Sequence, residues 1–184
     1  MTFLSPAGIP QPADDRIPDV VINATYMINM PILKKHSLTG ATLGFKNHLG
    51  TITDPAGLHE YISPGAGYFR TDYSPMVDIF RNPHIGPKTV LTIGDGLFAS
   101  KTGTTRAPEP WDSFGDEVPN SLFLAQDPVA IDCVMLDLVA VEAPVSDQAD
   151  AYLQVASSAG LGTFERGDPW GAGYTLIAYE KIEV

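Results

Sequence analysis

Apolar residues form three short, nearly continuous runs, which predict strands at residues 26–33, 88–93 and 121–125. Runs of this kind are typical of strands that are buried on both faces of a parallel sheet. Pro31 is expected near the end of the first strand, because proline cannot donate to a sheet ladder. The glycines around Asp95 predict the end of the second strand. A loose alternation over residues 174–184 predicts a last strand.

A glycine-bearing helix is predicted directly after the first strand, with Ser37 or Thr39 as its cap. Its apolar positions recur at helical spacing and are Leu38, Ala41, Phe45 and Leu49. Its polar positions form a second stripe and are Thr39, Thr42 and Lys46. Gly40 and Gly44 lie one turn apart. Since glycine weakens a helix by about 1 kcal/mol relative to alanine, the pair indicates close approach of another backbone or of a ligand.

Four more helices are predicted from periodicity and caps, at residues 18–24, 75–82, 128–141 and 147–159, with a helical turn within 55–61. Asp127 is the N-cap candidate of the third, and Pro128 suits its first position. Gly160 is placed where a helix end favours glycine. Residues 1–16 read as an extended lead-in, and most of 51–73 and 99–120 as loop. Strands alternating with helices predict a loop-rich α/β domain over residues 1–184, with a mainly parallel sheet and helices on both faces.

Composition narrows the classes of partner. The chain has 22 acidic and 11 basic residues and a net charge of −11, which argues against nucleic acid and anionic membranes as partners. No apolar run approaches the ~18 residues that a membrane span needs. No targeting signal is recognisable at the amino terminus. A soluble protein is expected, with the cytoplasm favoured as its compartment.

Against this acidic background, no Asp or Glu lies between Ala24 and Thr53, whereas the same stretch holds Lys34, Lys35 and Lys46. In open α/β sheets, ligands collect at the carboxyl ends of the strands. Lys34 and His36 follow the first predicted strand, Asp95 the second and Asp127 the third. If the strands are parallel, these polar groups could converge at one edge of the sheet.

A helix amino terminus beside lysine and histidine is suited to a carboxylate or a phosphate. We therefore expect a site for a small anionic ligand, in which Lys34, His36, Lys46 and Asp132 are the catalytic candidates. The ligand-binding candidates are Thr39, Thr42, Asn47, His59 and Asp95. Asp127 is the metal candidate. The alternative is that the lysines are solvated surface charges, that Asp95 forms a turn and that Asp127 is only a helix cap.

Asp132 is expected to be buried, because its predicted helix is apolar nearly all round. An unpaired buried carboxylate costs several kcal/mol, so Asp132 needs a cationic or donor partner. Lys34 and Lys46 are the obvious candidates. A site would place Lys46 and Asp132 in an open cleft, whereas a structural network would bury them in contact with each other.

Several common chemistries lack their motifs. The chain has no GxGxxG after a strand, no GxxxxGK[ST] loop and no GxSxG elbow. The histidines (His36, His48, His59 and His84) show no metal-site spacing. Cys133 is the single cysteine, so it can form no internal disulfide and no four-cysteine cluster. Its apolar neighbours predict a buried, inert thiol.

Residues 26–162 carry several motifs in one order. They are MINMPILKKHSLTGATLGFKNHLG with His59 after it, IGDG at 93–96, AQDPVAID at 125–132 and ASSAGLG at 156–162. In these motifs the chain resembles the uncharacterised DUF-362 family, and the first matches it through Ile28, Asn29, Pro31, Lys34, His36, Thr39, Lys46, Asn47 and Gly50. The resemblance implies no established activity.

Some members of that family carry ferredoxin-like iron–sulfur segments, and some are exported. A chain with one cysteine departs from the first group, so we expect no iron–sulfur cluster here, and the cofactor is left open. The family also has an upstream α/β portion that this sequence does not contain. The chain is therefore expected to be the C-terminal part of a larger family domain. Its expected partner is an upstream family segment or a redox partner.

Two hypotheses follow. In the first, the chain is an enzyme or part of one that binds an anionic substrate, while an aspartate positions a metal or moves a proton. In the second, it is a non-catalytic binding or redox-partner module, in which the same residues form a structural ion-pair network.

Overall fold

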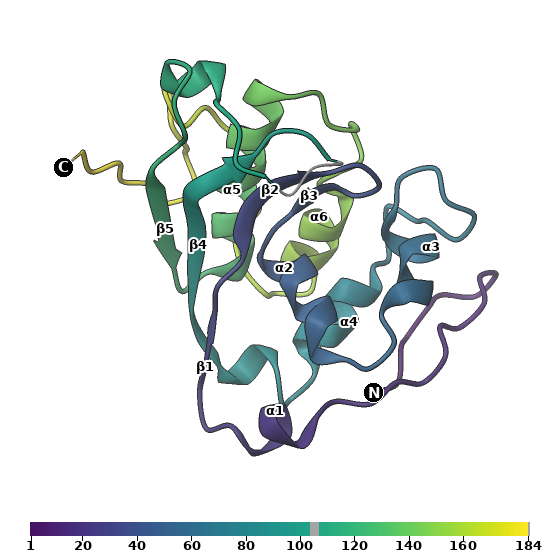
Figure 1. The fold of residues 1–184 in the computed structure, drawn as a ribbon. Coiled ribbons are helices and arrows are strands. Elements are labelled where there is room, and N and C mark those ends of the chain that lie inside the picture. Colours follow the sequence, from purple (N-terminus) through teal and green to yellow (C-terminus); the bar gives the residue numbers. More distant parts are fainter. Residues whose placement is uncertain (104–106, 184) are drawn as a thin grey trace.

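The computed structural model describes residues 1–103 and 107–183 and contains a mixed sheet. Its strands are β1 (Met27–Asn29), β2 (Ile32–His36), β3 (Gly40–Thr42), β4 (Thr89–Ser100) and β5 (Ser121–Ala125). At the centre, β1 and β2 both run parallel to β4, while β3 and β5 pair antiparallel on either side (Figure 1). The predicted α/β class, with parallel pairing at its centre, is confirmed.

The first predicted strand is real, but it is divided and it is buried on one face only. Pro31 separates β1 from β2, since it has no N–H, and its carbonyl accepts from the Asp95 N–H at 2.8 Å. Ile28 is 56% exposed and Ile32 52% exposed, whereas Leu33 is fully buried. The apolar run therefore reflects one core face and one apolar outer face, and the prediction of burial on both faces is wrong.

The helix predicted over residues 38–49 is largely a hairpin instead. β3 pairs antiparallel with β2, with His36 opposite Gly40 and Lys34 opposite Thr42. Gly40 has a φ of +83°, in the left-handed region that favours glycine, and a Cβ there would lie 2.5 Å from the Ala149 Cβ. The helix is reduced to α2 (Gly44–Asn47), followed by a 3₁₀ turn at His48–Thr51.

The glycines at 94 and 96 do not end β4, which continues to Ser100. A Cβ on Gly94 would lie 2.6 Å from Met135 Sδ, and one on Gly96 would lie 2.8 Å from Phe123 Cε2. These glycines are therefore required by close packing rather than by a turn.

β5 matches its prediction, but it runs antiparallel to β4. Its carboxyl end, with Asp127, thus lies at the opposite edge of the sheet from the ends of β2 and β4. The expected convergence of three strand ends is therefore wrong. Asp127 does cap α5 (Pro128–Glu142), by accepting from Val129 N–H and Ala130 N–H at 2.9 Å each.

The remaining helices are α1 (Asp19–Asn23), α3 (His59–Ile62), α4 (Pro75–Arg81) and α6 (Ala151–Ser158), with 3₁₀ turns at Ala56–Leu58, Gly86–Lys88 and Asp112–Phe114. These helices correspond to predicted elements, although α6 begins four residues later than expected, whereas the turns at Gly86–Lys88 and Asp112–Phe114 were not predicted. Gly160, just past α6, has a φ of +75°, as its position predicts. The strand predicted over 174–184 is not observed within residues 174–183.

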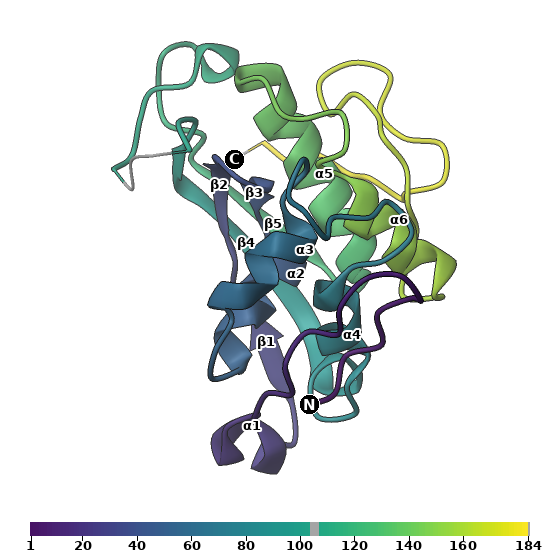
Figure 2. The ribbon, with the colours of Figure 1, turned by 90° about the vertical axis from the view of Figure 1, so that its right-hand side faces the viewer.

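The layers explain where the core lies. α5 lies along one face of the sheet with α6 behind it, while α2 and α3 lie beside the β3 edge (Figure 2). The fully buried side chains between these layers include Leu33, Leu43, Phe45, Met135, Leu136 and Leu153. Helices were expected on both faces, but among the described residues no helix covers the opposite face.

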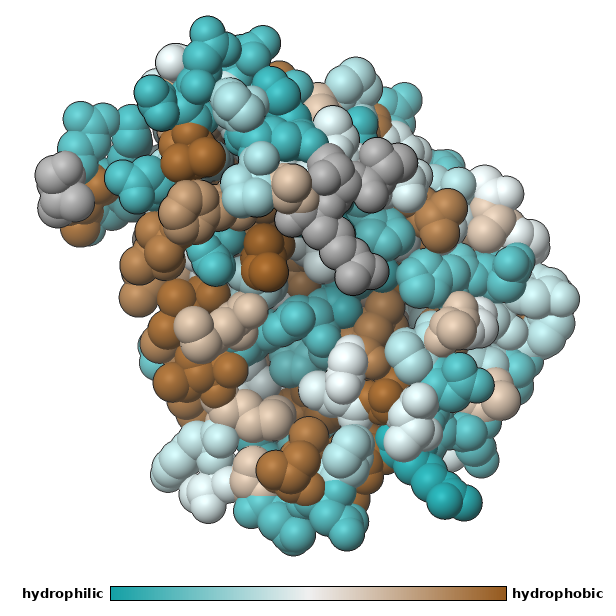
Figure 3. Space-filling view, viewed as in Figure 1, coloured by the Kyte–Doolittle hydropathy of each residue, from teal (hydrophilic) through white to brown (hydrophobic). Residues whose placement is uncertain are grey.

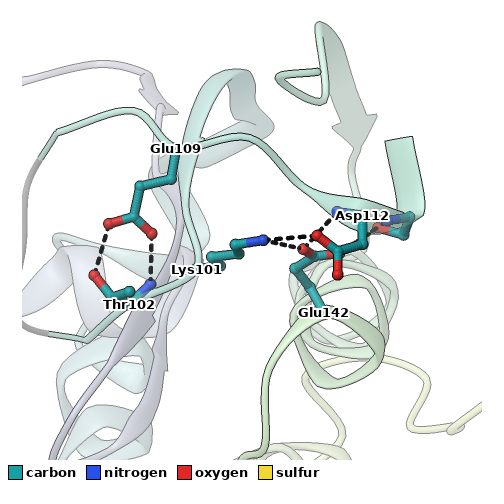
Figure 4. Close-up of polar contacts among 6 residues, drawn as sticks. Lys101, Thr102, Glu109, Asp112 and Glu142 are labelled. Carbon is teal, nitrogen blue, oxygen red and sulfur yellow. Dashed lines mark hydrogen bonds and ion pairs between the residues drawn. The ribbon is translucent and has the colours of Figure 1, made fainter. Parts of the chain in front are cut away.

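The long segment after β4 is held to the end of α5 by a polar network (Figure 4). Glu142 accepts from Lys101 Nζ at 2.9 Å, from Asp112 N–H at 2.7 Å and from the Ser113 hydroxyl at 2.7 Å. Burial alone would raise the pKa of Glu142, but these hydrogen bonds outweigh burial and hold the pKa at about 2. Trp111, in the same segment, is fully buried.

Candidate functional site

Lys34 and Thr42 form one cross-strand pair of the β2–β3 hairpin. Leu33 contacts the α5 side of the sheet, so its neighbour Lys34 points to the opposite side, and Thr42 points with it. The Thr42 hydroxyl oxygen is buried and has no hydrogen-bond partner among the described residues. A buried hydroxyl without a partner is uncommon in folded proteins and leaves this position able to bind a polar group.

Lys46 lies on α2 and is only 9% exposed. Its Nζ is 3.2 Å from His59 Nε2, at the start of α3. His59 Nδ1 is 3.1 Å from the Ala56 carbonyl, which can only accept. His59 therefore donates through Nδ1, and Nε2 is the ring nitrogen that can accept from the Lys46 ammonium.

His36 ends β2, and its ring stacks on His59 with 6.0 Å between ring centroids. Its Nδ1 accepts from Leu38 N–H and Thr39 N–H, each at 3.2 Å, which leaves Nε2 as the N–H donor. Burial and the nearby charges of Lys46, His59 and Lys34 lower the pKa of His36 to about 4. The ring is therefore neutral at pH 7.

Lys34, His36, Lys46 and His59 are called the cationic site below. Burial, with the charge of Lys34, lowers the pKa of Lys46 to about 8, so the ammonium is still mostly charged at pH 7. Within residues 1–103 and 107–183, no carboxylate lies within 4.0 Å of either lysine nitrogen. Two lysines and two histidines thus gather without a compensating carboxylate among these residues.

Asp132 is fully buried on α5, as expected, but its partner is not a lysine. Its carboxylate accepts from Gly44 N–H at 2.7 Å and Phe45 N–H at 3.0 Å, and from the Tyr152 hydroxyl at 3.2 Å. Burial raises the pKa of Asp132 to about 7, against the lowering effect of these three hydrogen bonds. The predicted pairing with Lys34 or Lys46 is wrong, and the carboxylate binds the amino terminus of α2 instead.

Neither arrangement expected for Lys46 and Asp132 is found. Both are buried, yet each has separate partners, so they form neither an open cleft nor a mutual ion pair. Asp132 acts as an internal cap that attaches α2 to α5. Gly44 is required at the contact, because a Cβ there would lie 2.8 Å from Asp132 Oδ1.

The side chains of the other predicted site residues form hydrogen bonds that do not involve the cationic site. The Thr39 hydroxyl donates to the Ala41 carbonyl, and the Asn47 amide donates to Asn29 Oδ1 at 2.7 Å. Asp95 lies in the middle of β4 and accepts from Leu97 N–H. Asp127, besides capping α5, accepts from Thr163 N–H at 2.8 Å, at the opposite edge of the sheet from the cationic site.

A hollow of about 420 Å³ borders the cationic site and shares His36 with it. The hairpin side chain of Lys35 lines it, together with Pro64, Gly103 and Val145. A volume of this size is within the range of small-molecule sites, ~300–1,000 Å³. Neither Lys34 nor Lys46 lines the hollow, so it adjoins the cationic site through His36 alone.

Two residues that the sequence did not single out for a role hold this region in place. Tyr152, from α6, reaches Asp132, and Asn29, from β1, binds both the Gly44 carbonyl and Asn47. Asn29 belongs to the first family motif, and that membership was the only sign of its role in the sequence. Tyr152 gives no local signal, since its role depends on how α6 packs on α5.

Metal binding and thiol chemistry have little support among the described residues. No three His, Cys, Asp or Glu side chains gather there in a way that could hold a metal ion. Cys133 is buried, as predicted, and burial raises its pKa to about 12. None of the described helices is long and apolar enough to cross a membrane.

Comparison with known proteins gives one match. The family model of a domain of unknown function, DUF362, matches residues 9–137, which include β1 to β5, the cationic site and Asp132. No curated protein and no solved structure matches the chain. The match covers more than half of the sequence and the elements that build the site, and the chain therefore belongs to the DUF362 family.

Proposed function

We propose that the protein binds a small anion, a carboxylate or a phosphate, in the cationic site. The observation that carries the proposal is Lys46, a nearly buried ammonium whose neighbours are a second lysine and two histidines. An uncompensated buried charge costs several kcal/mol. Strongly perturbed groups of this kind are typical of functional sites, where a ligand supplies the missing charge.

Each member of the site has a place in this proposal. Lys34 and Lys46 supply the charge, the His36 Nε2–H and the Thr42 hydroxyl add hydrogen bonds, and His59 orients Lys46. A lysine with a pKa of about 8 can also give or take a proton near neutral pH. If the protein is an enzyme or part of one, Lys46 is the acid–base group. If it is a non-catalytic binding module, the same contacts hold the ligand.

A thermal-unfolding screen against sulfate, phosphate, acetate and citrate tests the proposal. At 100 times its dissociation constant, a bound anion should add ~2.7 kcal/mol. For a chain of this size that is a rise in melting temperature of roughly 5–10 °C. We expect the rise for at least one anion in the wild type and its loss in Lys46→Met. The anion that gives the largest rise names the chemical class of the ligand.

Lys181→Met is the matched control, because Lys181 is an exposed lysine in the C-terminal segment and should leave the anion response intact. The stability of unliganded Lys46→Met separates the two hypotheses. Removing an uncompensated charge should leave stability unchanged or raise it. A marked loss of stability in Lys46→Met, together with no anion response in the wild type, would favour a structural network.

The affinity for sulfate should depend on pH through Lys46, since sulfate itself does not titrate near neutrality. Below pH 8 Lys46 is mostly protonated and His36 is already neutral, so the affinity should be level between about pH 6 and 7.5. Above pH 8 Lys46 loses its charge, and the affinity should fall by up to about tenfold per pH unit. Calorimetric titration over pH 6–10 measures this. Lys46→Arg stays charged throughout, so a fall of the same size in that variant would contradict the assignment.

A further inference from the structure

The face of the sheet opposite α5 carries an exposed apolar surface. Gly94 faces Met135 of α5, so its neighbours Ile93 and Asp95 point away from the core. Leu124 lies opposite Ile93, and Leu122 opposite Asp95, on the adjacent strand. The outer apolar face is defined here as seven exposed side chains: Ile28, Met30, Ile32, Leu97, Phe98, Leu122 and Leu124.

These seven side chains are 38–65% exposed. Together they expose an area on the order of 800 Å², more than the ~300–600 Å² of the largest apolar patch on a typical monomer. It is also close to the ~800 Å² that each partner contributes to a standard stable interface. Apolar side chains gather over β1, β4 and β5 in the space-filling view (Figure 3). A surface of this size favours a protein partner over a small ligand.

We propose that the outer apolar face is the interface of a homodimer, in which the sheets of two copies pack against each other. Most soluble oligomers are two-fold homodimers, whose interfaces place the same surface on both copies. The exposed area of the outer apolar face on one copy is about what each partner contributes to a stable interface. The side chains of this sheet face could interdigitate with those of a second sheet, as in proteins whose sheets pack about 10 Å apart.

The distribution of charge is compatible with a second copy. The chain carries a net charge of −11, so identical copies repel each other over most of their surfaces. On the outward positions of β1, β4 and β5, only Asp95 is charged, and its carboxylate is hydrogen-bonded to Leu97 N–H within its own strand, while Lys34 of β2 points to the same side of the sheet. The outer apolar face is thus a surface on which two copies can approach with little like-charge repulsion. This inference does not depend on the anion-binding proposal.

Sedimentation velocity of the full chain, from about 1 to 100 μM, tests the interface directly. We expect a species of twice the 19.7 kDa chain mass that dissociates on dilution. Leu124→Glu and Ile28→Glu place a carboxylate on two different strands of the face, and each should raise the dissociation constant at least about tenfold, because the charge would be buried without a partner.

Leu4→Glu is the matched control for Leu124→Glu, since Leu4 is 67% exposed and Leu124 is 64% exposed, and Leu4 lies outside the face. It should leave the dimer intact. Both face positions are exposed in the single chain, so the variants should keep the circular dichroism spectrum of the wild type. A wild type that is monomeric up to 100 μM would overturn the proposal, and so would a dimer that all three variants weaken equally or not at all.

Discussion

Replacing Asp132 by alanine is expected to lower the free energy of unfolding by about 3–5 kcal/mol. The carboxylate is fully buried and accepts from Gly44 N–H, Phe45 N–H and the Tyr152 hydroxyl. Its removal leaves three buried donors without an acceptor, and each costs about 1–3 kcal/mol before the site relaxes. The loss should detach α2, and with it Lys46, from α5.

Urea denaturation followed by circular dichroism measures this change, with two further variants for comparison. Asp132→Asn keeps one carbonyl oxygen but turns an amide group toward the backbone donors, so its loss should be smaller than that of alanine. Asp72→Ala removes an exposed carboxylate paired with Arg70 and should cost much less than Asp132→Ala, because solvent screens the exposed pair. A loss below 1 kcal/mol in Asp132→Ala would show that α2 is held by other contacts.

Asp137→Ala should have a comparable effect, of about 3 kcal/mol, on the other side of α5. Asp137 is 5% exposed and accepts from Arg166 Nε, from Gly167 N–H at 2.9 Å and from the Tyr174 hydroxyl at 2.9 Å. These three donors come from the C-terminal segment, and Arg166 also pairs with Asp150 at 3.1 Å. Removing the shared acceptor releases that segment from the helix, and the partial exposure of Arg166 moderates the cost.

Hydrogen exchange distinguishes this prediction from that for Asp132. In Asp137→Ala, the backbone amides of residues 165–177 should exchange faster, while those of 44–47 should keep their protection. The opposite pattern is expected for Asp132→Ala. If Asp137→Ala leaves both the unfolding free energy and exchange at 165–177 unchanged, the C-terminal segment is held by its apolar contacts rather than by this carboxylate.

The elements that the sequence predicted correctly have local causes. Asp127 and Pro128 begin α5, and Gly160 follows α6, because caps and first-turn residues act within a few positions along the chain. The three apolar runs were also recognisable, because each is formed by residues that are neighbours in the sequence. The orientation of β5 could not be predicted locally, since it depends on which strand lies beside it. Asp127 was therefore expected at the wrong edge of the sheet.

The hairpin at 36–42 was missed because its pattern also fits a helix. Leu38, Ala41 and Phe45 recur at helical spacing, but the turn is decided by Gly40, whose positive φ and contact with Ala149 belong to a hairpin packed against the residues before α6. The glycines of β4 were misread for a similar reason. Their cause is the approach of Met135 and Phe123, which lie far away in the sequence.

The absence of acidic residues between Ala24 and Thr53 was the signal in the sequence that pointed to this region. Lys34, His36, Lys46 and His59 come together on a hairpin and two short helices, whereas the sequence predicted a long helix for the residues around Lys46. The need of Asp132 for a donor was also predicted. Which donor it takes depends on the three-dimensional path of the chain, so the expected lysine was replaced by two backbone N–H groups and Tyr152.

In the proposed function, the buried Lys46 ammonium binds an anion that compensates its charge. NMR titration of the Lys46 side chain, with and without sulfate, phosphate or acetate, tests it most directly, since a bound anion stabilises the charged form. We expect a pKa of about 8 in the free protein and a rise of at least about one unit when one of these anions saturates the site. A pKa near 8 that none of the three anions changes would show that Lys46 does not bind them.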